Sequence, residues 1–295
     1  MGTVAIPRRR AVSLQAPRFR AQSIPLHLSL VLICLVWTVP TIGLLVSSFR
    51  PGNLVSTTGW WTAFVPPFQF TLENYQQVLA ARNMGQAFVN SLFISIPGTV
   101  IPITVAAFAA YAFAWMRFPA RNWLFLAVVG LLVVPLQMTL IPILRVYTTL
   151  GLNGTFLAVW LAHAGYGLPF GIYLLRNFFA GLPREMFESA YIDGAGPWTV
   201  FFRLVVPTSV PALASLAIFQ FLWVWNDLLV ALVYLGGTPA VAPLSVNTAN
   251  LVNSLGQNWQ QLTSAAFITM ALPLAVFFSL QGYFARGLLA GSVKG

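Results

Sequence analysis

The residues of this sequence that could do chemistry are few, and one group of them lies in a long apolar stretch. Trp223, Asn226 and Asp227 place an aromatic ring, an amide and a carboxylate close together in the chain. The amide and the carboxylate can hydrogen-bond to hydroxyl groups, and the ring offers a flat apolar face. Such a group is typical of a site that recognises a neutral, hydroxyl-rich solute.

The sequence patterns of enzymes are absent. The chain contains no paired carboxylates, no H-E-x-x-H run and no G-x-S-x-G elbow. A phosphate-binding loop needs G-x-x-x-x-G-K-[ST], but the single lysine, Lys294, lies next to the C-terminus. The single cysteine, Cys34, excludes an intrachain disulfide and a multi-cysteine metal site. We therefore predict no catalytic residue, no metal site and no ATPase activity in this chain.

The elements that must position these residues are transmembrane helices. Hydrophobic residues make up 58% of the 295 residues, charged residues make up 7%, and the mean hydropathy is +0.81. An apolar stretch of roughly 20 residues spans the bilayer as a helix. The chain is therefore expected to be an all-α integral membrane protein, a bundle of six helices that are each interrupted or flanked by proline. We place these spans near residues 26–49, 87–115, 122–144, 155–176, 208–234 and 262–285.

Basic residues set the expected orientation. With the N-terminus inside, twelve of the fifteen Lys and Arg residues lie on the inner side, and only Arg50, Arg82 and Arg145 lie outside. This asymmetry follows the positive-inside rule and places both termini in the cytoplasm. The net charge of +10 and the basic arm of residues 1–25 then fit anionic lipid rather than nucleic acid. Residues 26–295 are expected to form one transmembrane domain.

Polar side chains within the spans extend the candidate substrate path, because each must find a partner or line water. Asp227, the only acid in a predicted span, either lines this path or fixes the outer end of the fifth span as a cap or an interhelical hydrogen bond. Trp223 either stacks on the solute or anchors the membrane interface. The candidate path residues are Asn90, Gln137, Gln220, Trp223, Asn226 and Asp227.

A second polar group, residues 188–195, reads ESAYIDGA and lies in a predicted cytoplasmic loop of about residues 178–207. Pro183 suits a first helical turn, Glu188 suits the positive end of the helix dipole, and Gly194 can close the helix in the left-handed conformation. Pro197 can start another helix. The pattern predicts a helix, a glycine corner and a second helix, which is typical of a docking site. An amphipathic helix lying on the membrane surface is the alternative.

The same loop resembles the EAA loop of ABC importer permeases. That family's pattern is Glu-Ala-Ala, three residues, Gly, nine residues, Ile, any residue, Leu, Pro. This sequence matches it at Glu188, Ala190, Gly194 and Pro207, and departs conservatively at Ser189, Leu204 and Val206. Other runs are similar to the carbohydrate-uptake branch, in particular to the maltose-permease partner with a short C-terminal tail. These runs are TLENY (71–75), PLQMTLIP (135–142), LGLNGT (150–155), GLPFGIYLLRNFF (167–179), WVWNDLL (223–229) and GLLAGSVKG (287–295).

The resemblance implies a type I importer permease of the bacterial plasma membrane, forming half of a path for a sugar or a glycosylated solute. It implies three partners: a second permease subunit, a cytoplasmic ATPase dimer that binds ATP and magnesium, and an extracytoplasmic sugar-binding protein. This chain would bind no cofactor. The ATPase would couple to Glu188, Ser189, Ala190, Asp193, Gly194 and Ala195, and would contact the tail at Ser292, Val293, Lys294 and Gly295.

An ion-gradient-driven secondary carrier for a small polar solute is the alternative function. Such a carrier normally places acids or histidines near the membrane midplane. Here Asp227 is expected near the outer boundary, and His163, in the fourth span, is expected to be an ordinary hydrogen-bonded helix contact. These positions favour the ATP-driven importer.

Overall fold

The computed structural model describes residues 24–81, 83–251 and 258–290, with the side chains of the last helix described up to residue 282. Every regular element within these residues is a helix. Four helices are long and apolar enough to span a membrane, and two bent helix pairs raise the number to six when each pair is one span. The four are α1 (Ile24–Ser48), α4 (Met84–Trp115), α7 (Phe156–Ala180) and α14 (Trp259–Ala290).

The third predicted span is broken rather than continuous. Helix α5 (Arg121–Gly130) continues into a short 3-10 turn, η3 (Leu131–Val133), and then meets α6 (Leu136–Thr149) at an angle of 102°. The span placed at 122–144 is therefore a bent pair of helices rather than one straight helix. The cause lies at Pro135, because a proline disfavours helical backbone in the residue before it, and Val134 is indeed extended, with ψ of 116°.

The fifth predicted span differs in the same way. It consists of α9 (Pro197–Val200), a π-helical segment η4 (Phe201–Val205) and α10 (Val206–Thr208), which together meet α11 (Val210–Trp225) at 75°. The bend falls at the residue between α10 and α11, which has prolines two residues before and after it. Helix α11 ends at Trp225, and a separate helix α12 (Leu229–Tyr234) follows. The span placed at 208–234 is therefore a bent pair that begins earlier, at Pro197, and ends at Trp225, before the separate helix α12.

Small residues let the central helices approach closely, as is usual in membrane bundles. Helix α4 packs along α7 and α11. A Cβ added to Gly171 on α7 would lie 3.0 Å from the Cβ of Ala106 on α4. A Cβ added to Gly167 would lie 2.6 Å from the side-chain amide oxygen of Gln220 on α11. These contacts fix the distance between the helices that carry most of the candidate path residues.

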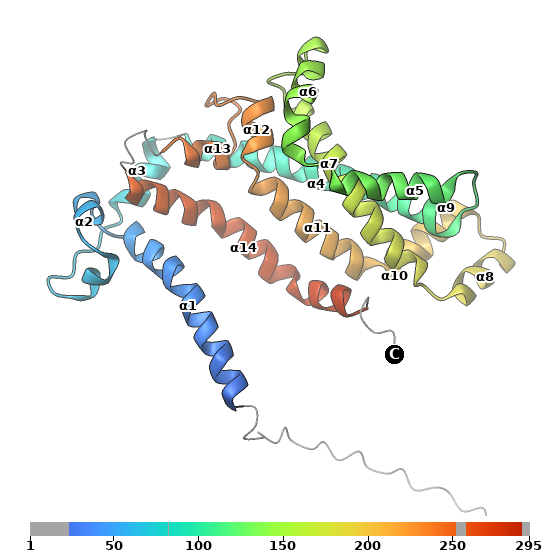
Figure 1. Ribbon diagram of the computed structural model, residues 1–295, viewed down its shortest axis with the longest axis horizontal. Helices are drawn as coiled ribbons and strands as arrows, with labels where there is room; N and C mark the ends of the chain where they lie inside the picture. Colours follow the sequence, from blue (N-terminus) through green and yellow to red (C-terminus); the bar gives the residue numbers. More distant parts are fainter. Residues whose placement is uncertain (1–23, 82, 252–257, 291–295) are drawn as a thin grey trace, which may run out of the picture.

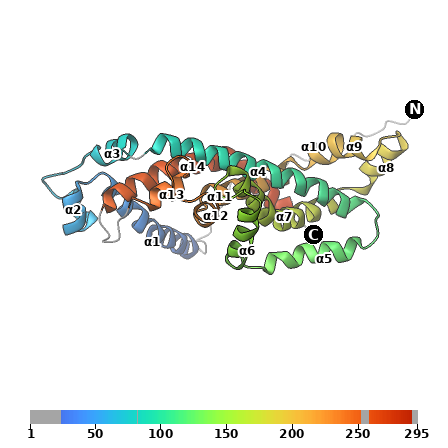
Figure 2. The same ribbon diagram turned by 90° about the horizontal axis from the view of Figure 1, so that it is seen from above.

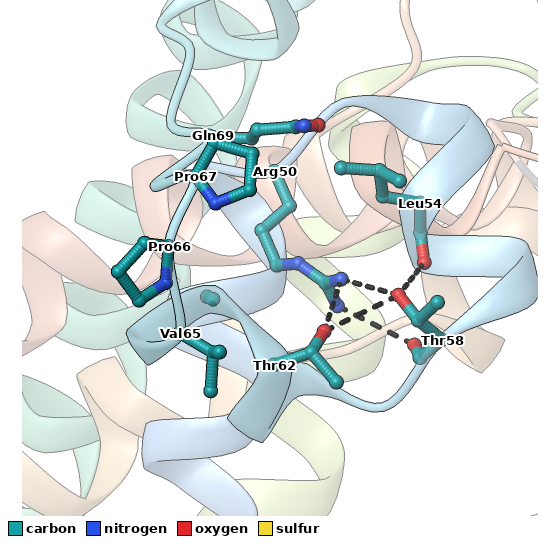
Figure 3. Close-up of a pocket in the computed structure, with 9 residues that line it drawn as sticks. Arg50, Leu54, Thr58, Thr62, Val65, Pro66, Pro67 and Gln69 are labelled. Atoms are coloured by element: carbon teal, nitrogen blue, oxygen red, sulfur yellow. Dashed lines mark hydrogen bonds between the residues drawn. The ribbon is translucent and has the colours of Figure 1, made fainter.

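The C-terminal end of α1 is tied into a small cap formed by α2 (Gly52–Thr57), η2 (Trp60–Phe64) and α3 (Glu73–Ala81). Arg50 is 2% exposed, and its guanidinium donates hydrogen bonds to the Gly59 carbonyl (3.2 Å) and the Thr62 hydroxyl (3.0 Å). The Asn74 amide donates to the Arg50 carbonyl (2.8 Å). Figure 3 shows the guanidinium beside Thr58 and Thr62, in the wall of a cavity of about 280 Å³.

The two ends of the molecule carry different elements. Figures 1 and 2 both place α2 and α3 at one end and α8 (Arg184–Ile192) at the opposite end. Helix α13 (Leu244–Ala249) lies towards the α3 end, and α1 stands away from the bundle over most of its length (Figure 1). Within α1 only Gly43 and Ser48 are buried.

Candidate functional site

The loop predicted to couple the chain to an ATPase folds as a helix, a glycine corner and a helix. Helix α8 begins after Pro183 and is capped by Asp193. The N–H of Ala195 donates to the carbonyl of Ala190 (2.9 Å), and the N–H of Gly194 donates to that of Tyr191 (3.0 Å). This pair of bonds is a Schellman cap. The predicted arrangement is confirmed.

Gly194 is required at the corner by its backbone and not by its surroundings. Its φ is +78°, in the left-handed region that side chains rarely adopt, and a Cβ added there would meet nothing within 4 Å. Helix α9 then begins at Pro197, whose fixed φ and missing N–H suit a first helical position. A β-branched side chain at position 194 would therefore strain the corner without colliding with anything.

Aromatic side chains fasten the corner to the bundle. Phe187 is 1% exposed and stacks on Trp115 of α4, with ring centroids 3.6 Å apart and planes 18° apart. The Trp115 indole N–H donates to the carbonyl of Phe179 at the end of α7 (2.9 Å). The Tyr111 hydroxyl of α4 donates to the Pro197 carbonyl (3.3 Å). The corner is thus in direct contact with α4, which in turn bonds to the end of α7.

The opposite face of α8 is free of such contacts. Ile192 is 86% exposed, the side chain of Glu188 is 65% exposed, and Arg184 pairs with Glu188 at 3.8 Å across one helical turn. Ser189 and Asp193 are also exposed. The corner therefore presents one apolar and several polar side chains outwards, at the far end of the molecule. The predicted contact tail, residues 292–295, lies outside the described residues.

The two tryptophans near the end of α11 point in different directions. Trp225 is 1% exposed, and its indole N–H donates to the Thr269 carbonyl of α14 (3.0 Å). Trp223 is 37% exposed, and Asn226, which caps α11, is exposed as well. Of the pair, Trp223 alone is available to a solute, and Trp225 holds α11 against α14.

Asp227 lies in the break between α11 and α12 and caps α12. Its two carboxylate oxygens accept from the N–H groups of Val230 (3.2 Å) and Ala231 (3.0 Å). The hydroxyl of Ser245, on α13, donates to the Asp227 carbonyl. The cap that the sequence allowed is thus present, while 10% of the side chain stays exposed beside Trp223.

The buried amides among the candidate path residues are bonded within the protein. The Gln220 side-chain amide donates to the carbonyls of Gly98 (3.1 Å) and His163 (3.5 Å). The Asn90 side-chain amide donates to two carbonyls of the 240–242 loop, both at 3.1 Å. Gln137 is exposed at the start of α6 and shares no hydrogen bond with the other candidates within the described residues. The structure therefore leaves Trp223 and Asn226, and a small part of Asp227, accessible, whereas Gln220 and Asn90 bond to neighbouring segments.

One neighbour of Trp223 and Asp227 was not among the predicted path residues. His163 of α7 is fully buried; its Nε2 lies 3.8 Å from Oδ2 of Asp227, and its ring lies edge-on to Trp223 with centroids 5.3 Å apart. Neither ring nitrogen has a hydrogen-bond partner within the described residues, so the expectation of an ordinary hydrogen-bonded helix contact is wrong. The cause is distance in sequence: no local pattern connects His163 with a residue 64 positions later.

Known proteins match nearly the whole chain. The osmoprotective compounds uptake permease protein GgtD of Synechocystis sp. is 60% identical, over 92% of this chain and 93% of its own length. The alpha-glucoside transport system permease protein AglG of Rhizobium meliloti is 43% identical, over 91% and 96% respectively. Both relatives are permeases, so the comparisons support the importer and give no support to a secondary carrier.

The fold matches solved transporters too. A chain from a bacterial ABC transporter that imports the acidic polysaccharide alginate superimposes with a TM-score of 0.75 at 20% identity, covering 91% of this chain and all of that one. Residues 102–289, which include the broken fifth span and the glycine corner, match the family described as the binding-protein-dependent transport system inner membrane component. The chain therefore belongs to this family, as a multi-pass permease subunit of an ABC importer in the bacterial plasma membrane.

Proposed function

We propose that this chain forms half of the translocation path of an importer for a neutral sugar or a glycosylated solute. The other half is a second, homologous permease. An extracytoplasmic binding protein delivers the cargo, and a cytoplasmic ATPase dimer supplies the energy. The solved alginate transporter has been seen with its own periplasmic protein bound, which supports the same division of roles here.

Coupling to the ATPase is assigned to the glycine corner, at Glu188, Ser189, Ala190, Asp193, Gly194 and Ala195. The observation that carries this assignment is the Schellman cap at Gly194, fastened inwards by Phe187 and exposed outwards at Ile192. A rigid, outward-facing corner can seat in a partner and pass its movement to α4 and α7. ATP and magnesium would be bound by the separate ATPase and not by this chain. The tail of residues 292–295 is proposed as a further ATPase contact.

The cargo is inferred from side chains and relatives together. Around the exposed Trp223 and Asn226 the described side chains offer aromatic faces, amides and one carboxylate, and α11 carries no basic residue. An anionic cargo would favour basic side chains along its path. The named substrates of the relatives are osmoprotective compounds and alpha-glucosides. A neutral glycoside fits both observations.

The coupling assignment is tested by Gly194→Val, with Gly151→Val as the matched control. Both glycines have positive φ (+78° and +69°) and open space around an added Cβ, but only Gly194 lies in the corner. A non-glycine residue in such a conformation costs about 1–3 kcal/mol. We expect G194V to reach the membrane normally but to lose at least tenfold in uptake and in capture of the ATPase.

The measurement is co-purification of the ATPase through a tag on this chain, with uptake of radiolabelled maltose, trehalose and a glucosylated polyol into proteoliposomes containing the binding protein. Stimulation by one of these probes would also identify the cargo class. Equal uptake and equal ATPase capture by G194V and G151V would contradict the coupling assignment.

A further inference from the structure

His163 is an unexplained polar group in the centre of the bundle. It is 0% exposed, and both of its ring nitrogens lack a hydrogen-bond partner within the described residues. Buried polar groups are nearly always hydrogen-bonded, and an exception calls for a specific reason. In a membrane protein the cost is greater, because lipid offers no alternative partner.

Asp227 is the acid that His163 faces. The chain has five acids, and the other four, Glu73, Glu185, Glu188 and Asp193, lie in the outer cap or at the cytoplasmic corner. Oδ2 of Asp227 accepts one hydrogen bond, from Ala231, and a carboxylate oxygen can accept a second. The distance from His163 Nε2 to this oxygen is 3.8 Å, about 1 Å longer than an ordinary hydrogen bond.

The two sides of this gap are held differently. His163 sits in a tight contact of three helices: its carbonyl accepts from Gln220 of α11, and a Cβ added to Gly98 of α4 would lie 3.7 Å from the His163 Cβ. Asp227 instead lies in the non-helical break of residues 226–228, between α11 and α12. Because Asp227 caps α12, a small movement of this break together with α12 towards α7 would close the gap.

We propose that His163 is a positioning residue of the translocation path: its imidazole N–H closes a hydrogen bond onto Asp227 in one state of the transport cycle, and its ring supports Trp223. Because it is fully buried, His163 acts through Asp227 and Trp223 and does not contact the cargo. The bond holds the α11–α12 break against α7 and so fixes the side chains that the cargo meets. This inference rests on the proposed sugar path.

The transport test uses the assembled transporter with its binding protein and the same three radiolabelled probes. His163→Phe keeps a ring beside Trp223 but removes the N–H donor, and His163→Gln restores a donor. We expect H163F to lower the maximal uptake rate about tenfold, with less than a twofold change in the half-saturating concentration of binding protein. H163Q should recover at least half of the rate. His27→Gln, which alters the exposed histidine of α1, should leave the rate unchanged.

The coupling between the two residues is tested with Asp227→Leu, which has no acceptor for the His163 N–H. If His163 acts through Asp227, the double variant H163F/D227L should be no slower than the slower single variant, since both changes remove the same bond. Effects that multiply would overturn the proposal. Equal rates for H163F and the unaltered chain would overturn it as well. Failure of the unaltered transporter to take up any of the probes would instead count against the proposed cargo class.

A spectroscopic measurement needs no cargo. Subtracting the spectrum of the H163Q transporter from that of the unaltered histidine-labelled transporter identifies the ¹⁵N imidazole signals of His163 among those of all the subunits. We expect these signals to shift in D227L and to differ between the ATP-free and ATP-bound transporter. If the His163 signals are the same in D227L and in both nucleotide states, the proposed bond does not form and the inference fails.

Discussion

At the scale of single residues, glycines on α7 decide how closely α11 can approach. Gly167 leaves room for the side-chain amide of Gln220, whose hydrogen bond to the Gly98 carbonyl joins α11 to α4. Gly165, two residues earlier on the same helix, has nothing within 4 Å of an added Cβ. A methyl group at position 167 would therefore collide with α11, whereas one at position 165 would meet no atom of another helix within 4 Å.

This difference gives a paired prediction. In Gly167→Ala the new methyl group would lie within 3 Å of the buried Gln220 amide, which must shift from the position in which it bonds to Gly98. Overpacking of this kind costs about 1–3 kcal/mol. We expect a clearly lower thermal unfolding midpoint for G167A in detergent and an unchanged midpoint for Gly165→Ala. Similar midpoints for both variants would show that the Gln220 contact does not limit stability.

Residue types alone did not reveal which polar groups face outwards. Trp223 and Trp225 are two positions apart, and only the structure shows that one is half-exposed and the other fully buried. Asn90, Gln220 and Asp227 were predicted as polar groups in need of partners, and each has them. Residues distant in sequence determine whether such a group hydrogen-bonds to another helix or is accessible to a solute. The sequence therefore identifies the candidate residues but not which of these two roles each has.

At the scale of elements, helix α8 is attached to the bundle through one buried side chain. Phe187 is the buried side chain of α8, and it rests on Trp115 of α4. Replacing Phe187 with Ala removes this stack, and the loss of a buried phenylalanine costs about 3–5 kcal/mol in a protein core. We expect Phe187→Ala to insert in the membrane but to lose ATPase-driven uptake while keeping part of its ATPase attachment.

Met186→Ala is the control for that experiment, because Met186 lies on the same turn but is only partly buried. Uptake by proteoliposomes and the ATP hydrolysed per cargo molecule are the quantities to measure. If the corner is no longer packed on α4, part of the ATP should be hydrolysed without transport. The number of ATP molecules hydrolysed per cargo molecule should therefore rise in F187A and stay unchanged in M186A. An unchanged ratio in F187A would show that the aromatic stack does not transmit the movement.

Sequence patterns located the helices better than their interruptions. Hydropathy placed the spans of α1, α4 and α7 within a few residues, and the spacing of Pro183, Gly194 and Pro197 predicted the corner. Every span contains or adjoins a proline, yet Pro40, Pro97 and Pro169 lie inside unbroken helices, whereas Pro135 marks a 102° bend. Whether a proline interrupts a helix depends on the surrounding bundle, which local sequence does not contain.

At the scale of the whole molecule, the glycine corner and the outer cap lie at opposite ends (Figure 2). Ser189 on α8 and Ser56 on α2 are both exposed, so each can be replaced by Cys with little disturbance. Cys34 is the single natural cysteine and is replaced by Ser first. With a membrane-impermeant maleimide, and with the permease produced without its ATPase so that the corner is uncovered, we expect S56C to react in intact spheroplasts and S189C only in inverted vesicles.

The reactions of these two variants test the orientation that the basic residues predict. Reaction of both cysteines from one side would show that the two ends do not lie across the membrane from each other. The reversed pattern would place the corner outside and would contradict any contact with a cytoplasmic ATPase.

The π-helical segment and the 75° bend of the fifth span together have a mechanical consequence. Two helical segments joined at a fixed angle can convert a displacement of one end into a displacement of the other end in a different direction. Residues 197–208 form the shorter segment, next to the corner, and α11 forms the longer one, with Trp223 near the end where Trp225 bonds to α14. A displacement of the corner would therefore move Trp223 sideways in the sugar path. Because α11 is longer than the 197–208 segment, the displacement of Trp223 would be larger than that of the corner.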